Sequence, residues 1–427
     1  MTFVRAQRYL QAGTRAGSDQ FFALCMRLGR IHTGIRKICV FDHIGGSCRA
    51  AYLESILQSA GYRTGRLTRS MTDGLRSRIY LDGQPISHKQ VCDLTDQIMQ
   101  AMAGMQKEQG NQTVLDFDSE QKICALALLA FCCHGCDFII FEASGDFAND
   151  PMAVAAPYTL VMPSGFGTKD TAAAKKQAAD ACQAIRRGTR EVITGFTGGE
   201  VYNLISQACA AAGSRLTVPA KSEAQVGESS LSRTEFTYRG KGAYRLHSSF
   251  EVQFEAALAA IEACYALRRD GVRLPGAAII AGIGRAKAEL CFDVLTVRPG
   301  IVVSVIDSAE DARAVLAALH QKSNSFGGKV VLCVSSAPHR LLAAFEKEFA
   351  DAEQSAYNVC EVMLVGEESD LPAQYAHVHV KTCTSTKKAA KQLLGYTDPE
   401  VTVLCLGDPA FCYGMKSAVN DALIGLS

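Results

Sequence analysis

The segment from residue 38 to residue 68 constrains the fold of this 427-residue chain more than any other. An apolar run at 38–41 predicts a buried strand, and a tight loop with Gly45 and Gly46 follows it. The residues from Cys48 to Ser59 have a helical pattern, which ends before a second short strand. A strand, a glycine loop and a helix N-terminus together present free backbone N–H groups and a positive dipole end. The layout is therefore typical of a phosphate-binding unit.

Strand-like apolar runs alternate with amphipathic helical patterns along almost the whole chain. This alternation predicts an α/β fold with a mainly parallel sheet and helices on both of its faces. The polar residues 219–245 predict a short β insertion or a loop, and residues 282–295 mark a boundary after which the strand–helix pattern starts again. We therefore expect a larger domain over residues 1–285 and a smaller, doubly wound α/β domain over residues 286–427.

Composition narrows the classes of partner that the chain can have. Apolar residues make up 48% of the chain and charged residues 20%, as in ordinary soluble globular proteins. The formal net charge of +1 gives no electrostatic reason to expect nucleic acid or an anionic membrane as a partner. No apolar stretch approaches the roughly 18–20 residues of a membrane span, and residues 1–21 contain no signal-peptide core. We expect a monomeric, cytoplasmic protein.

Seventeen cysteines are spread through the predicted strands and helices. That distribution suits buried, reduced thiols better than the disulfide framework of a small secreted domain. The one dense cluster holds Cys132, Cys133, His134 and Cys136, all of which are ligand types for zinc. The cluster also stands where an apolar helix ends before a strand, and no second cysteine pair lies at zinc-ribbon spacing. A structural helix end is favoured, while a metal or redox role stays open.

Five stretches, taken in chain order, resemble the folylpolyglutamate synthases of the Mur ligase superfamily. AYLESILQSAGYRTGRLT is similar to the first helix and second strand of that family, and RSRIYLDGQPIS to its E-R-I-x-I-N-G-x-P-I-S segment. CDFIIFEASGD resembles V-D-x-x-x-x-E-V-G-L-G-G, and AIRRGTREVITG resembles G-I-I-K-x-G-x-P-V-V-x-G. VVSVIDSAEDARAVLAAL resembles V-I-L-D-G-A-H-N-P-E-A-A-R-A-L, which opens the C-terminal domain of the family.

The resemblance implies a Mur-ligase-like architecture, with a central P-loop-type domain, a C-terminal Rossmann-like domain and ATP between them. Members of the family join glutamate to a folate through an acyl phosphate. The resemblance thus implies ATP and Mg²⁺ as cofactors and a folate-like or other carboxylate as the small-molecule substrate. Such a reaction needs a phosphate cradle, magnesium and cationic stabilisation of the transferred phosphoryl group.

The phosphate loop of the family, G-T-N-G-K-G-S-T, corresponds without gaps to residues 42–49. The resemblance therefore places these residues at the nucleotide: Gly45, Gly46, Ser47, Cys48 and Arg49. The lysine that contacts the outer phosphates is replaced by Gly46, and the magnesium-binding serine by Cys48, a poor ligand for a hard cation. In a shifted register Ser47 would supply a hydroxyl and Arg49 a cation. Otherwise the loop only closes a βαβ turn.

The remaining site residues follow from the same resemblance. They are Glu142 and Ser47 for the metal, Asp307 for the nucleotide and Arg78 for the substrate. The metal-binding histidine of the family has no counterpart, because no histidine lies between His134 and His247. The lysine of the family's E-K-A-G helix, which binds metal when carbamylated, is missing from residues 180–183.

Two functions are compatible with these residues. In the first, the chain is an ATP-dependent tetrahydrofolate:L-glutamate γ-ligase whose activity is impaired by the missing lysine and metal ligands. In the alternative, it is a catalytically inactive relative that binds a small molecule or a partner protein. Each missing group usually contributes orders of magnitude in rate, so their combined loss favours impaired or absent ligase activity. A dehydrogenase-like protein would need a G-x-G-x-x-G motif after the first strand, and none is there.

Overall fold

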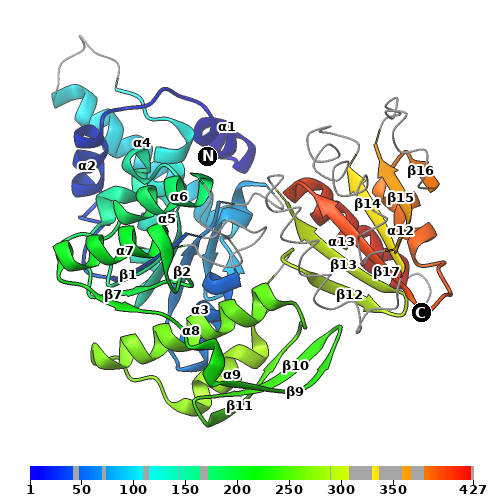
Figure 1. Cartoon of the computed structure of the whole chain (residues 1–427). Coiled ribbons are helices and arrows are strands. Elements are labelled where there is room, and N and C mark those ends of the chain that lie inside the picture. The colour runs from blue at the N-terminus through cyan, green and yellow to red at the C-terminus, as the bar shows by residue number, and fades with distance from the viewer. Residues whose placement is uncertain are drawn as a thin grey trace. The chain divides into compact units, whose positions relative to one another are not determined.

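The computed structural model describes residues 1–41, 48–69, 74–108, 115–143, 145–163, 172–288, 290–306, 329–335, 358–366 and 379–424. The chain divides into two compact units, and it contains three sheets, whose strands are labelled in Figure 1. The first comprises Met1–Phe41, Leu53–Pro219 and Ala259–Gly282, and the second Asp42–Tyr52, Ala220–Leu258 and Ile283–Ser427. The domains expected over residues 1–285 and 286–427 stay a prediction.

The first unit is built on an eight-stranded sheet with the strand order β4-β3-β2-β5-β1-β6-β7-β8. In chain order the strands are β1 Arg36–Val40, β2 Thr64–Leu67, β3 Ile79–Leu81, β4 Gln84–Pro85, β5 Phe138–Glu142, β6 Leu160–Met162, β7 Glu191–Ile193 and β8 Arg215–Thr217. All neighbours from β2 to β8 are parallel, whereas β3 and β4 form an antiparallel hairpin. Strands β5 and β6 are buried at every position, as expected for parallel strands covered on both faces.

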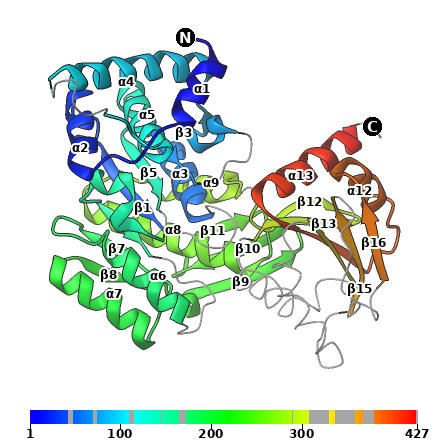
Figure 2. The ribbon, with the colours of Figure 1, turned by 90° about the horizontal axis from the view of Figure 1, so that it is seen from above.

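Helices and 3₁₀ turns precede, connect and follow these strands. They are α1 Phe3–Gln11, α2 Ser18–Arg27, α3 Cys48–Ser59, η1 Leu75–Arg78, α4 His88–Glu108, α5 Ser119–His134, η2 Phe147–Asn149, η3 Pro151–Ala155, α6 Ala172–Cys182, α7 Gly199–Ala212, α8 Glu251–Arg269 and α9 Gly276–Arg285. Helices α1, α2, α4 and α5 pack against one another beyond one face of the sheet (Figures 1 and 2). Their apolar residues share a core with Cys39 of β1 and with Phe41, which directly follows that strand.

The side chains of Ile38 and Val40 lie on the face of β1 opposite to that of Cys39, because successive residues of a strand point to opposite faces. Both are fully buried. Helix α9 packs directly on α3: a Cβ added at Gly282 would lie 2.4 Å from the Cα of Ile56, and the Ser55 hydroxyl donates to the Gly282 carbonyl at 2.8 Å. The helix predicted from Cys48 to Ser59 is confirmed as α3, and α9 lies in close contact with it.

The strand order creates a topological switch point at the carboxyl end of β1. The chain leaves β1 through α3 to β2 on one side, while β5 is followed by β6 on the other side of β1. In register, Val40 lies between Glu142 of β5 and Met162 of β6. Ligands of open α/β sheets bind outside the carboxyl ends of the strands at such a point. Glu142, the last residue of β5, therefore lies at the place where such a sheet binds ligands.

The second unit contains a three-stranded antiparallel sheet and a six-stranded sheet ordered β12-β13-β17-β14-β15-β16. The strands are β9 Ala224–Ser230, β10 Arg233–Tyr238, β11 Lys241–Leu246, β12 Asp293–Val297, β13 Gly300–Val305, β14 Lys329–Ser335, β15 Asn358–Val365, β16 His379–Cys383 and β17 Val401–Gly407, with the 3₁₀ turn η4 Lys221–Glu223 and the helices α12 Thr386–Leu393 and α13 Pro409–Ile424. The β insertion predicted at 219–245 is confirmed. The strand–helix pattern of the sequence predicts helices at 309–321 and 339–349, and both lie outside the described residues.

Candidate functional site

Glu142, the predicted metal ligand, is the last residue of β5 and is only 7% exposed. Its carboxylate faces an arginine of the neighbouring strand β2, with 3.5 Å between Arg66 Nη1 and Glu142 Oε1. A second arginine holds its backbone, since Arg69 Nε donates to the Glu142 carbonyl at 3.1 Å. The strand-end carboxylate thus already has a cationic partner from its own chain.

Arg66 joins two carboxylates that come from different elements. Its Nε donates to Glu54 Oε2 on α3 at 2.7 Å, in addition to its contact with Glu142. Its guanidinium lies over the ring of Tyr80, which pairs with it across β2 and β3, at 4.2 Å from the centroid. Burial alone would lower the pKa of Arg66, but the carboxylates of Glu54 and Glu142 outweigh it and raise that pKa. Arg66 is therefore a permanent cation.

A second group of ion pairs continues from Arg69. Its guanidinium bonds the buried carboxylate of Asp150 and also donates to Glu120 Oε2 at 2.6 Å. Arg78 Nη2 donates to the same Glu120 oxygen at 2.9 Å, and Arg78 Nε donates to the Thr68 carbonyl at 3.1 Å. Burial would raise the pKa of Glu120, but hydrogen bonds and charges from Arg78 and Arg69 lower it overall. Glu120 is therefore ionised at neutral pH.

These pairs form one network of three arginines and four carboxylates at the carboxyl edge of the sheet. Its members are Glu54, Arg66, Arg69, Arg78, Glu120, Glu142 and Asp150. Sequence reasoning pointed to Glu142 and Arg78 and missed the other five. Arg66 did leave a signal, because a charged residue inside a short buried strand is rarely tolerated without a partner. The identity of its partners has no local sequence signal.

Comparisons with known proteins agree with this fold. No protein-family model matches the chain. A segment of 157 residues is 30% identical to the dihydrofolate synthase/folylpolyglutamate synthase of Bacillus subtilis. The aligned segment covers 36% of this chain and 35% of that relative. The apo structure of folylpolyglutamate synthase from Lactobacillus casei superposes with a TM-score of 0.77, at 16% identity and over 100% of both chains. The Thermotoga maritima enzyme gives 0.77 at 17% identity, over 98% and 97% of the chains.

The chain has the folylpolyglutamate synthase fold. The predicted α/β class and the predicted resemblance are thereby confirmed. A further solved relative, the Mycobacterium tuberculosis synthase in complex with ADP and AMPPCP, superposes with a TM-score of 0.77 at 16% identity over 98% of each chain. The aligned segment spans about a third of the length of the Bacillus subtilis relative.

The nucleotide residues predicted on the folylpolyglutamate synthase pattern are described only in part. Cys48 and Arg49 begin α3 and are 2% and 1% exposed, so both side chains pack inside the protein. Gly45, Gly46 and Ser47 lie outside the described residues, as does Asp307. The nucleotide-binding roles of all six therefore stay predictions, and so does the role of Arg78 toward a substrate.

The described residues do not fit a magnesium ion. Magnesium needs several oxygen ligands in near-octahedral geometry. Among the residues that the structure describes, no group of three or more His, Cys, Asp or Glu side chains could hold a metal ion. Glu142, the strand-end carboxylate predicted for that role, faces Arg66 instead.

The cysteine-rich stretch 132–136 forms the end of α5, as the favoured interpretation expected. Gly135 adopts a left-handed conformation with φ of 70°, and its N–H bonds the Cys132 carbonyl at 3.0 Å. This is the usual way in which glycine terminates a helix. His134 Nε2 lies 2.6 Å from Asp82 Oδ2, at the turn between β3 and β4. The histidine thus has a local partner from the hairpin.

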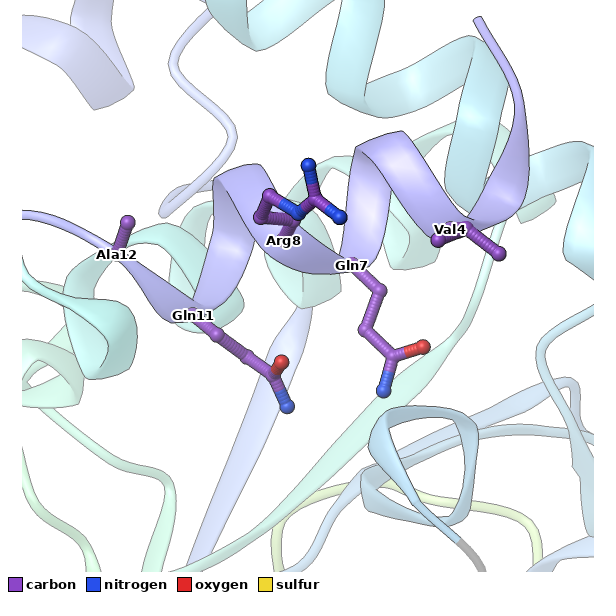
Figure 3. Close-up of a pocket in the computed structure, with 5 residues that line it drawn as sticks. All are labelled: Val4, Gln7, Arg8, Gln11 and Ala12. Carbon is purple, nitrogen blue, oxygen red and sulfur yellow. The ribbon is translucent and has the colours of Figure 1, made fainter.

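A hollow of about 430 Å³ lies beside α1. It is lined by Val4, Gln7, Arg8, Gln11 and Ala12, all from α1 and the residue that follows it (Figure 3). None of the predicted site residues lines it.

Over the described part of the chain, no helix is long and apolar enough to cross a membrane. Cytoplasmic location, the monomeric state and the lack of a nucleic-acid partner stay predictions.

Proposed function

We propose that this protein is a folylpolyglutamate synthase-like protein that keeps a small-molecule site but has lost most of the magnesium-dependent ligase activity. The observation that carries the proposal is the ion pair between Arg66 and Glu142 at the switch point of the sheet. A carboxylate already paired with a guanidinium is not available as a ligand for magnesium, unless that pair opens.

Two departures in the sequence act in the same direction. Gly46 stands at the place of the phosphate-binding lysine, and Cys48 at the place of the magnesium-binding serine. Phosphoryl transfer depends almost wholly on positioning and on neutralising the negative charge of the transferred group. Losing the lysine and the metal together removes two of the main sources of that neutralisation, and each such loss commonly lowers the rate by orders of magnitude.

Retained binding is supported by the scaffold itself. One solved relative of this fold is a complex with AMPPCP and folate, with a TM-score of 0.76 at 17% identity over 99% of this chain. We therefore infer a nucleotide or a folate-like carboxylate as the ligand class of this chain. Without a metal at Glu142, nucleotide binding here would not depend on magnesium.

Calorimetry of the full chain with ATP, with and without Mg²⁺, tests the proposal. We expect the same ATP affinity in both conditions, and no glutamate-dependent release of ADP or phosphate with a folate substrate. The variant Glu142→Gln serves as the matched control, because a functional metal ligand would change the ATP affinity only when magnesium is present. Magnesium-dependent binding at micromolar ATP, together with turnover, would overturn the proposal and support an active ligase.

A result without ATP binding would also be informative. If a well-folded sample gives no heat of binding at millimolar ATP and none with folate, the proposal that the protein retains a small-molecule site would be wrong. The remaining function on this scaffold would then be the binding of a partner protein.

A further inference from the structure

Two buried carboxylates share a single guanidinium at the carboxyl edge of the first sheet. Glu54 of α3 is 5% exposed and Glu142 of β5 is 7% exposed, and both contact Arg66 of β2. The second oxygen of Glu54, Oε1, is buried and has no hydrogen-bond partner among the described residues. The two carboxylates therefore offer more oxygen atoms to a cation than the guanidinium of Arg66 contacts.

Buried carboxylates need a counter-charge, since an ionised group away from water is stable only when it is paired or bound to a metal. Oxygen ligands from two separate elements that meet around one positive charge have the donor chemistry of a hard divalent cation. The guanidinium of Arg66 occupies the position at which these oxygens meet, in contact with both.

The neighbouring arginine cannot take over this role. Arg69 contacts only the backbone carbonyl of Glu142, and its other donors are directed to Glu120 and Asp150. Arg66 is also held in place by the ring of Tyr80, over which its guanidinium lies. Removing Arg66 would consequently leave Glu54 and Glu142 without a positive side-chain partner in the part of the chain that the structure describes.

We propose that Arg66 is a built-in cation that fills a latent divalent-cation site formed by Glu54 and Glu142, and that this site binds a divalent metal once the guanidinium is removed. The inference rests on the proposed function, since it names the residue that makes the site independent of magnesium. It concerns the metal alone and involves no nucleotide.

The test is Mn²⁺ binding by the nucleotide-free, full-length chain, followed by electron paramagnetic resonance. The variant Arg66→Met keeps most of the packing on Tyr80 and removes the charge, whereas Arg66→Lys keeps a charge in place. We expect Arg66→Met to bind one Mn²⁺ at least roughly tenfold more tightly than the wild type, and Arg66→Lys to resemble the wild type. The double variant Arg66→Met/Glu142→Gln should lose the gained affinity.

Two results would overturn the proposal. One is a folded Arg66→Met variant that binds Mn²⁺ no more tightly than the wild type. The other is a gained affinity that Glu142→Gln leaves intact. If Arg66→Met does not fold alone, Mn²⁺ must restore its circular dichroism, and failure to do so refutes the proposal. Because ATP is absent throughout, this outcome is independent of whether the chain binds nucleotide.

Discussion

Removing the charge of Arg66 should destabilise the folded protein strongly. In Arg66→Met the aliphatic stem remains, but Glu54 and Glu142 are left buried without their guanidinium. Taking away one partner of a buried ion pair typically costs about 3–5 kcal/mol, because the other charge stays in a medium of low dielectric constant.

The structure places the expected loss near the lower end of that range. The contact of Arg66 with Glu54 is close at 2.7 Å, but its contact with Glu142 is longer at 3.5 Å, and the Arg66 side chain keeps 15% of its exposure. We expect a decrease of about 3 kcal/mol in the free energy of unfolding, a large fraction of the roughly 5–15 kcal/mol typical of native domains. Adding Glu54→Gln should recover part of the loss, because it removes the closest unpaired charge.

Urea denaturation followed by circular dichroism measures this quantity. The matched control is Arg27→Met, which breaks the surface pair between Arg27 and Glu108, at 2.7 Å and with side chains 37% and 66% exposed. Exposed pairs of this kind contribute about 0–1 kcal/mol. If Arg66→Met lowers the free energy of unfolding no more than Arg27→Met does, the buried ion pairs of Arg66 do not stabilise the fold.

Three further predictions concern other parts of the first unit. The lowered pKa of Glu120 means that its ionised form stabilises the fold at pH values above the unfolded-state pKa of about 4.3, and this contribution is lost as the pH falls through the folded-state pKa. The urea midpoint should therefore decrease less on acidification in Glu120→Gln than in the wild type. Gly282→Ala should lower the free energy of unfolding by about 1–3 kcal/mol, because its Cβ would meet backbone of α3, whereas Gly276→Ala, with open space around its Cβ, should be close to neutral in the same assay. Iodoacetamide at pH 8 should modify the exposed Cys133 well before Cys136, since burial raises the pKa of Cys136 to about 12; equal labelling by mass spectrometry would contradict this.

Much of the local structure could be predicted from the chain alone. The helix Cys48–Ser59 was expected with the bounds that it has, and the apolar run within CDFIIFEASGD predicts a short buried strand where Phe138–Glu142 lies. The hairpin of β3 and β4 turns at Asp82 and Gly83, which take φ of 47° and 76°, as an Asp-Gly pair favours. Strand β12 was missed, because it is an edge strand of mostly intermediate burial whose structure depends on its pairing with β13.

By itself, the sequence determined the α/β class, the family resemblance and the departures at Gly46 and Cys48, since periodicity and residue identity are local properties. Only the tertiary structure decided that Arg66 pairs with Glu54 and Glu142. Glu54 lies 12 residues from Arg66 along the chain, whereas Glu142 lies 76 residues from it, and the three meet because β2 pairs with β5 and α3 brings Glu54 to Arg66. An ion pair acts through space, so its partners follow from which elements are neighbours and from how little water lies between them.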